Sequence, residues 1–209
     1  FARLMEFAAS AFRVMTFGEA LRGLANGNLP SRALVVTFDD GYADNAEIAL
    51  PIMKRVGVPG TFFVATGFLD GGRMWNDSVI ECLRRSSERE IDLEFLGLER
   101  TLLVTDEYRR RAIESVLSRI KYQRLEERDL AIAQLRTAAS VDWLPDDLMM
   151  TSGQVKTLYD AGLEIGGHTV NHPILKSLAP PAAEEEIAKC RAHYESVGLG
   201  TEYIDQFIR

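Results

Sequence analysis

The chain has 209 residues, 46% hydrophobic and 26% charged, a balance that predicts one soluble globular domain over 1–209 with a sizeable core. Its net charge is -7 and its longest basic run is Arg109 to Arg111, so a nucleic-acid partner is not expected. No apolar run approaches the roughly 18 to 20 residues of a membrane span, and the first residues show no signal-peptide pattern. Cys82 and Cys190 lie far apart in helix-like patterns, which predicts two small apolar residues and no disulfide.

Two helices are predicted before the first strand. Apolar residues at helical spacing predict a helix over about 4–12. Thr16 and Glu19 form a capping-box pattern, which predicts a second short helix ending near Gly27. We expect both helices to serve as scaffold.

A strand, a helix and a second strand follow in the sequence. The apolar, β-branched run at 33–38 predicts a buried strand, and 61–65 predicts another. Residues 42–56 between them predict a helix in which Pro51 either introduces a kink or starts the second half. Two strands joined in this way form a parallel βαβ unit, so the predicted fold class is α/β.

The stretch from Gly67 to about Asp147 differs in character, because it is charged and mostly helical. Two amphipathic helices are predicted near 107–120 and 126–139, with one short extended piece around 93–104. The charge runs are interpreted as solvated helix faces. This stretch is therefore interpreted as a long helical insertion, about 67–147.

After the insertion the α/β pattern returns. Residues 152–161 predict a helix, 163–165 a strand, 180–197 a further helix and 203–208 a last strand. His193 falls on the outer face of the helix at 180–197. It is predicted to be a solvated surface residue without a functional role.

Two adjacent carboxylates, Asp39 and Asp40, end the strand predicted at 33–38. Neighbouring carboxylates repel one another and are costly to desolvate, so a cation or a proton is expected between them. The alternative is that the two side chains cap the helix that follows.

Two of the three histidines, His168 and His172, are separated by four residues, a spacing that lets both imidazoles face one point. Gly166 and Gly167 before them and Pro173 after them favour a loop at a strand end over a helix. In α/β folds such loops lie at the carboxyl ends of strands, where ligands bind. The alternative is that the imidazoles only form hydrogen bonds within a turn.

One carboxylate and two imidazoles would leave a divalent metal with open positions for water and substrate, as in catalytic zinc sites. Nonheme iron oxygenases use the same ligands, so the ligand types alone do not choose the metal. A second carboxylate beside the ion would act as a general base in hydrolysis, whereas an oxygenase would not need it. The pattern therefore favours hydrolysis.

These motifs resemble those of the polysaccharide deacetylases, also called carbohydrate esterase family 4 or the NodB-homology domain. The family motif Thr-Phe-Asp-Asp matches Thr37 to Asp40, and the motif His-Ser/Thr-x-x-His matches His168 to His172. The run Gly60 to Val64 and the lead-in Glu164 to His168 are also similar to the family pattern. The resemblance covers about 29–208, interrupted by the insertion.

The resemblance implies a distorted (β/α) barrel that holds a divalent metal through Asp40, His168 and His172. Zn²⁺ is the expected ion, with Co²⁺, Ni²⁺ and Mn²⁺ as alternatives. Asp39 would be the general base that deprotonates the metal-bound water. This water would attack the acetyl carbonyl of an N- or O-acetylated polysaccharide or oligosaccharide.

Two aromatic residues are candidates for contacts with the sugar. Tyr42 lies two residues after the first motif, and Trp75 lies close to Gly71 and Gly72 in the sequence. The alternative for Trp75 is packing of the insertion. The family usually acts on extracytoplasmic substrates, so a periplasmic or cell-envelope location is expected, and a cytoplasmic one stays open.

The family pattern continues beyond the second motif with residues that supply an oxyanion contact, a partner for the base and a histidine acid. The chain reaches Arg209 where the third motif should begin. We therefore expect a continuation that completes the barrel, because an open barrel would expose strand edges. The alternative is a fragment that is unable to close its barrel. The alternative functions are a catalytically silent, metal-containing carbohydrate-binding protein and a hydrolase of a small cyclic amide.

Overall fold

The computed structural model describes residues 1–199, which fall into two compact units. Among the described residues, the first unit comprises 1–72 and 147–199, and the second comprises Arg73–Asp146. The stretch interpreted as an insertion thus forms a compact unit of its own, with boundaries within six residues of those expected. The strand predicted at 203–208 lies outside the described residues.

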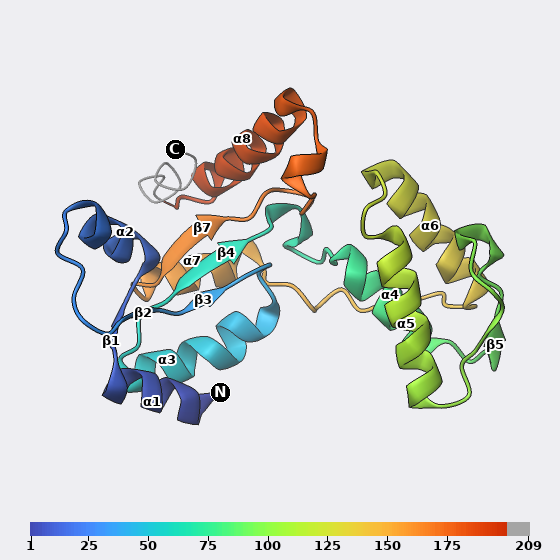
Figure 1. The fold of residues 1–209 in the computed structure, drawn as a ribbon, viewed down its shortest axis with the longest axis horizontal. Helices are drawn as coiled ribbons and strands as arrows, with labels where there is room; N and C mark the ends of the chain where they lie inside the picture. The colour runs from blue at the N-terminus through green and yellow to red at the C-terminus, as the bar shows by residue number, and fades with distance from the viewer. Residues whose placement is uncertain (200–209) are drawn as a thin grey trace. The chain divides into compact units, whose positions relative to one another are not determined.

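Three parallel strands form the central sheet of the first unit, in the order β3 (Thr37–Phe38), β4 (Thr61–Val64) and β7 (Glu164–Gly167) (Figure 1). The crossover from β3 to β4 runs through α3 (Leu50–Val56), which confirms the predicted βαβ unit and the α/β class. Within residues 1–199 the strands do not close into a barrel, so the barrel part of the prediction is not confirmed.

The continuous strand predicted at 33–38 is divided in the structure. Its first half, β2 (Ala33–Val35), pairs in parallel with β1 (Arg13–Met15), whereas β3 pairs with β4. Between the halves, the Val36 carbonyl accepts a hydrogen bond from the Thr61 amide at 3.0 Å. All six residues are half-buried or exposed, so the prediction of a buried strand is wrong. Strand β1 was not predicted, because three residues are too few to show a period.

The remaining helices of the first unit lie where the sequence pattern predicted them. The Thr16 hydroxyl accepts from the Glu19 amide while the Glu19 carboxylate accepts from the Thr16 amide, which confirms that capping box. A π-helical segment leads directly into α3, a detail that the pattern did not predict. The predicted helices are α1 (Ala2–Ala11), α2 (Phe17–Ala25), α7 (Ser152–Asp160) and α8 (Pro180–Ser196). The structure adds the π-helix η1 (Asn45–Ala49) and the unpredicted 3₁₀ turns η2 (Thr66–Phe68) and η4 (Leu175–Ser177).

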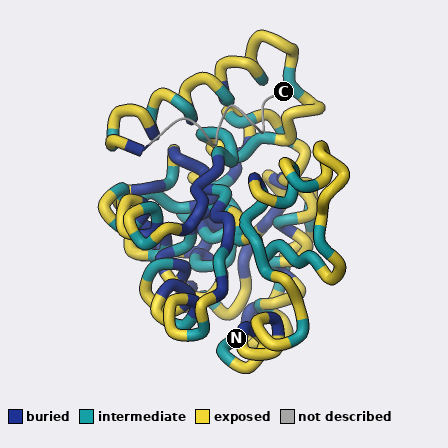
Figure 2. The backbone as a smooth tube through the Cα atoms, turned by 90° about the vertical axis from the view of Figure 1, so that its left-hand side faces the viewer, coloured by how far each residue is buried: buried dark blue, intermediate teal, exposed yellow. Residues whose placement is uncertain are grey.

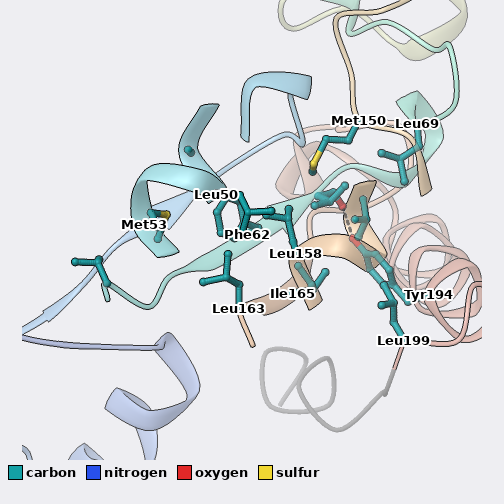
Figure 3. Close-up of a cluster of buried hydrophobic side chains, with 14 of the residues drawn as sticks. Leu50, Met53, Phe62, Leu69, Met150, Leu158, Leu163, Ile165, Tyr194 and Leu199 are labelled. Carbon is teal, nitrogen blue, oxygen red and sulfur yellow. Dashed lines mark hydrogen bonds between the residues drawn. The ribbon is translucent and has the colours of Figure 1, made fainter. Parts of the chain in front are cut away.

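The hydrophobic core of the first unit lies between the central sheet and helices α3, α7 and α8 (Figure 3). Phe62 of β4 is fully buried and stacks on Phe38 of β3, with ring centroids 4.4 Å apart. The Tyr194 hydroxyl of α8 lies 2.8 Å from the Val64 carbonyl and 3.2 Å from the Gly166 carbonyl. Helix α8 is thereby attached to the backbone of both β4 and β7.

A buried carboxylate joins α2 to the amino ends of β4 and β7. The Glu164 side chain accepts hydrogen bonds from the Thr61 hydroxyl at 2.6 Å and from the Gly18 amide, which lies 3.1 Å from each carboxylate oxygen. The Thr61 hydroxyl in turn accepts from the Phe17 amide at 2.9 Å. These bonds stabilise the end of the sheet opposite to the predicted site.

The second unit has its own hydrophobic core, formed by three helices and a two-stranded antiparallel sheet. Its two longer helices agree with the predicted positions within one residue. Trp75 packs against this core, with the Arg128 guanidinium 5.0 Å from the centre of its ring. The elements are α4 (Trp75–Arg85), β5 (Glu90–Ile91), η3 (Glu94–Leu96), β6 (Thr101–Leu102), α5 (Asp106–Ile120) and α6 (Leu125–Ala138).

Two further predictions concern the whole described chain. Cys82 and Cys190 are free and buried, which confirms that each acts as a small apolar residue. Among residues 1–199, the helices are either too short or too polar to cross a bilayer.

Candidate metal centre

The predicted site residues lie at the carboxyl ends of the central strands. Strand β3 leads into Asp39 and Asp40, and β7 leads into His168. Because β3, β4 and β7 are parallel, these segments meet at one edge of the sheet, as expected for ligand-binding loops of an α/β fold. The middle strand, β4, contributes the backbone of Ala65 to Gly67 between them.

Three of the predicted residues converge on one point. The Asp40 Oδ1 atom lies 3.5 Å from His168 Nε2 and 3.4 Å from His172 Nε2. The two Nε2 atoms lie 3.1 Å apart. The three atoms therefore form a nearly equilateral triangle, with one corner from the loop after β3 and two from the loop after β7.

The size of this triangle fits a divalent metal. Nitrogen and oxygen ligands bind zinc at about 2.0 to 2.2 Å, so neighbouring ligands of a tetrahedral ion lie about 3.3 to 3.6 Å apart. The side chains are partly exposed, 33% for His168, 35% for His172 and 24% for Asp40. An ion bound here would thus keep a side open to water and substrate.

The backbone around Asp40 has an unusual conformation that the sequence can tolerate. Asp40 has a φ of +73°, in the left-handed region that aspartate adopts more readily than most residues. Gly41 follows with a φ of +96°, and a Cβ atom there would lie 2.7 Å from Val64 Cγ1. The Asp40 carbonyl accepts a hydrogen bond from the Ala65 amide at 3.1 Å. Gly41 is therefore required for the close approach of this turn to β4.

The histidine loop is also held against the end of β4. The Thr169 carbonyl accepts from the Thr66 amide at 3.1 Å, and the Val170 carbonyl accepts from the Gly67 amide at 3.0 Å. Within the loop, the Thr169 hydroxyl accepts from the His172 amide at 3.1 Å. Thr169 and His172 both have positive φ, +66° and +50°. The loop is not helical, which confirms the predicted strand-end loop.

Asp39, the predicted general base, lies beside this cluster in the sequence but does not belong to it. Its side chain is exposed, and its carbonyl accepts from the Gly41 amide at 2.9 Å. The alternative that the two aspartates cap the next helix is wrong, because the helical turns begin only after Tyr42 and the Asp40 carboxylate lies among the imidazoles. Tyr42 is half-buried and forms an antiparallel bridge with Met149.

The other aromatic candidate, Trp75, lies in the second unit and contacts that unit's core. Its proposed contact with substrate stays a prediction.

The third histidine differs from its prediction. His193 is half-buried, with Nε2 3.4 Å from the Ser152 hydroxyl, so its interpretation as a solvated residue is wrong. Ser152 donates from its hydroxyl and its amide to Asp70, at 2.6 and 2.8 Å, and these bonds lower the pKa of that carboxyl. His193 thus belongs to a cluster that joins α8 to the start of α7.

One residue near the site was missed in the sequence. Glu186 of α8 accepts hydrogen bonds from the loop between the two histidines. No motif marks it, because it stands among the acidic residues of an otherwise exposed helix.

The comparisons with known proteins identify the family of this chain. The family model described as polysaccharide deacetylase matches residues 26–203. The Bacillus subtilis (strain 168) protein YxkH, whose name places it provisionally among the polysaccharide deacetylases, is 36% identical over 56 residues, which cover 26% of this chain and 20% of YxkH.

Among the solved structures that match this chain are two deacetylases. The Streptococcus pyogenes deacetylase PplD in complex with acetate is 17% identical, with a TM-score of 0.52 over 94% of this chain and 55% of that chain. The BpsB deacetylase domain from Bordetella bronchiseptica is 17% identical, with a TM-score of 0.44 over 92% of this chain and 59% of that chain. The chain thus spans about half of PplD, and the likeness to PplD shows the fold alone.

Proposed function

Because the chain belongs to the polysaccharide deacetylase family, a family of hydrolases, we propose that it removes acetyl groups from an N- or O-acetylated polysaccharide. The observation that supports this most strongly is the convergence of the Asp40 carboxylate with two imidazoles from another loop. Ligands of these types in this geometry suit an ion that activates water for hydrolysis.

We assign Asp40, His168 and His172 as the ligands of a divalent metal, most simply Zn²⁺, with Co²⁺, Ni²⁺ or Mn²⁺ as alternatives. When bound, the ion would act as a Lewis acid that lowers the pKa of a water molecule and polarises the acetyl carbonyl. Asp39 is exposed and adjacent in the chain to Asp40, and we propose it as the base that accepts the proton of the attacking water. Tyr42 and Trp75 are proposed to contact the sugar.

Two further proposals concern the intact protein. We propose that its strands complete the distorted barrel predicted from the sequence. We also propose that it acts in the periplasm or cell envelope, which fractionation of the producing cells would test.

The deciding experiment measures acetate release from acetylated oligosaccharides by the intact protein, with Zn²⁺ or Co²⁺ added. The Asp39→Asn variant keeps the size of the side chain but removes the base, so acetate release is expected to fall by about 10²- to 10⁴-fold. Metal content should stay at the wild-type level, because Asp39 is not proposed as a ligand.

The same experiment tests the alternative of a silent carbohydrate-binding protein. That alternative predicts metal and glycan binding without turnover, and a glycan affinity that Asp39→Asn does not change. An absence of acetate release across N- and O-acetylated substrates, with metal bound, would contradict the proposed activity.

A further inference from the structure

Helix α8 carries a buried carboxylate that faces the histidine loop. Most residues of α8 are exposed (Figure 2), yet Glu186 is only 8% exposed. Its Oε2 atom accepts hydrogen bonds from the Val170 and Asn171 amides, both at 2.9 Å. Its Oε1 atom accepts from the Asn171 side-chain Nδ2 at 2.7 Å. One carboxylate thus accepts three hydrogen bonds from two adjacent residues.

These bonds fix the segment that separates the two imidazoles. Val170 and Asn171 directly precede His172, whose position relative to His168 depends on the conformation of that segment. The Val170 carbonyl is bound by the Gly67 amide on one side, and the Val170 amide is bound by Glu186 on the other. The loop is therefore held from two directions, by the end of β4 and by α8.

The backbone of this loop needs such support. Thr169 and His172 flank the segment with positive φ, a conformation that non-glycine residues adopt at a cost of about 1 to 2 kcal/mol each. Hydrogen bonds to an ionised carboxylate are roughly twice as strong as those between neutral groups. The Glu186 carboxylate thus offsets the cost of the loop conformation.

We propose that Glu186 is a positioning residue of the metal centre, which holds His172 at the distance from His168 that a metal requires. This inference rests on the proposed function, because it takes the two imidazoles to be ligands. Groups that orient metal ligands commonly contribute 10- to 100-fold to metal affinity. Glu186 does so through the backbone of the loop and not through a contact with the imidazoles.

A purely structural role is the competing explanation, and Glu164 supplies a matched control. Both residues are buried glutamates of the first unit that accept hydrogen bonds from backbone amides. Glu164 accepts its hydrogen bonds at the amino end of β7. Glu186 accepts its hydrogen bonds from the loop that follows the carboxyl end of β7. Replacement of either residue should lower stability, but only replacement of Glu186 should change metal affinity.

The test measures the dissociation constant of Zn²⁺ by calorimetry and the melting temperature without metal, using the intact protein. Glu186→Ala is expected to weaken Zn²⁺ binding about 10- to 100-fold. Glu186→Gln keeps an oxygen acceptor for both backbone amides but loses the charge and the acceptor for the Asn171 side chain, so a smaller loss than that of Glu186→Ala is expected. Glu186→Asp keeps the charge but shortens the side chain by one methylene, so it should also weaken Zn²⁺ binding. This variant keeps the test possible if Glu186→Ala does not fold.

Several outcomes would overturn the inference. One is an unchanged Zn²⁺ dissociation constant in Glu186→Asp and Glu186→Ala. Another is an equal loss of Zn²⁺ affinity in Glu164→Ala, because the effect would then follow general destabilisation. If the wild-type protein itself binds no divalent metal, the metal centre of the proposed function fails instead, which separates the two conclusions.

Discussion

Asp39 and Asp40 are adjacent in the chain, yet only Asp40 places its carboxylate among the imidazoles, 3.4 Å from His172 Nε2, while the Asp39 side chain is exposed. The backbone of Asp40 has a left-handed conformation at the point where these two adjacent side chains diverge. Two carboxylates that would otherwise compete for one cation can therefore take different roles, one as a ligand and one as a base.

The three histidines provide an internally controlled test of the metal centre. His168→Ala is expected to weaken Zn²⁺ binding by at least about 100-fold, because it removes one of the three proposed protein ligands. His193→Ala should leave Zn²⁺ binding unchanged, because His193 contacts Ser152 and does not belong to the cluster. Calorimetric titration of both variants with Zn²⁺ checks the prediction. Equal affinity in the two variants would remove the assignment of His168 as a ligand.

Gly67 is predicted to be a sensitive position although it carries no functional group. A Cβ atom on Gly67 would lie 2.7 Å from the Val170 carbonyl oxygen and 2.9 Å from Val170 Cγ1. Gly67→Ala should therefore displace the histidine loop and weaken Zn²⁺ binding about tenfold or more.

Gly153→Ala is the control for Gly67→Ala. Gly153 lies in α7, and a Cβ atom there would meet only the Thr151 hydroxyl, at 3.7 Å. This substitution should leave Zn²⁺ affinity unchanged and stabilise the helix by roughly 0.5 to 1 kcal/mol. A Gly67→Ala variant with wild-type affinity would show that the loop can shift without consequence for the site.

Cys82 is expected to make the stability of the second unit sensitive to alkaline pH. Burial raises the pKa of its thiol from the ordinary value of 9.0 to about 11, despite the opposing effect of Arg136. Between these values the unfolded thiol loses its proton while the folded thiol keeps it, so the free energy of unfolding falls as pH rises. The loss should reach roughly 2 to 3 kcal/mol above pH 11.

The measurement is urea unfolding of the second unit at pH 8 and at pH 10.5, for the wild type and for Cys82→Ala. The change in the free energy of unfolding with pH is compared between the two proteins. The difference reports the thiol alone, because the lysine and tyrosine residues that titrate in the same range are present in both. The alanine variant should lack this part of the pH dependence. Parallel curves for the two proteins would show that the thiol ionises equally in the folded and unfolded states.

Removal of the second unit should leave the metal centre intact. All three proposed ligands lie in the first unit, and the Asp70 amide donates to the Met150 carbonyl at 3.2 Å, which holds the flanking segments together. A protein in which a short Gly-Ser linker replaces Arg73–Asp146 should bind Zn²⁺ with wild-type affinity. Loss of binding with retained secondary structure would show that the second unit contributes to the site.

Much of the fold was predictable, because it depends on patterns local in the sequence. The helix at α5, the βαβ unit around α3 and the capping box at Thr16 each follow from a continuous stretch of the sequence. The histidine loop was predictable from Pro173 and the preceding glycines. Strand β1 was not, because its three residues are defined by their pairing with β2.

The three proposed ligands were predicted from the two motifs, but the contacts that hold their loops in place were not. The sequence places Asp40 and His168 far apart, and only the parallel register of β3, β4 and β7 brings their loops to one edge. Glu164 and Glu186 could not be identified, because a glutamate in a sequence carries no sign that its partners are backbone amides from other elements. The break in the strand at Val36 could not be predicted either, because it arises where the pairing changes from β1 to β4.

The hydrogen bonds at the end of β4 have a consequence for how metal binding can be observed. The amides of Ala65, Thr66 and Gly67 donate in succession to Asp40, Thr169 and Val170, so three consecutive protons bridge to both ligand loops. Neither loop can open without exposing at least one of these protons to solvent exchange with deuterium. The hydrogen-exchange rates of these three amides thus report how often either loop opens. Slower exchange on addition of Zn²⁺ would show that the ion holds both loops closed.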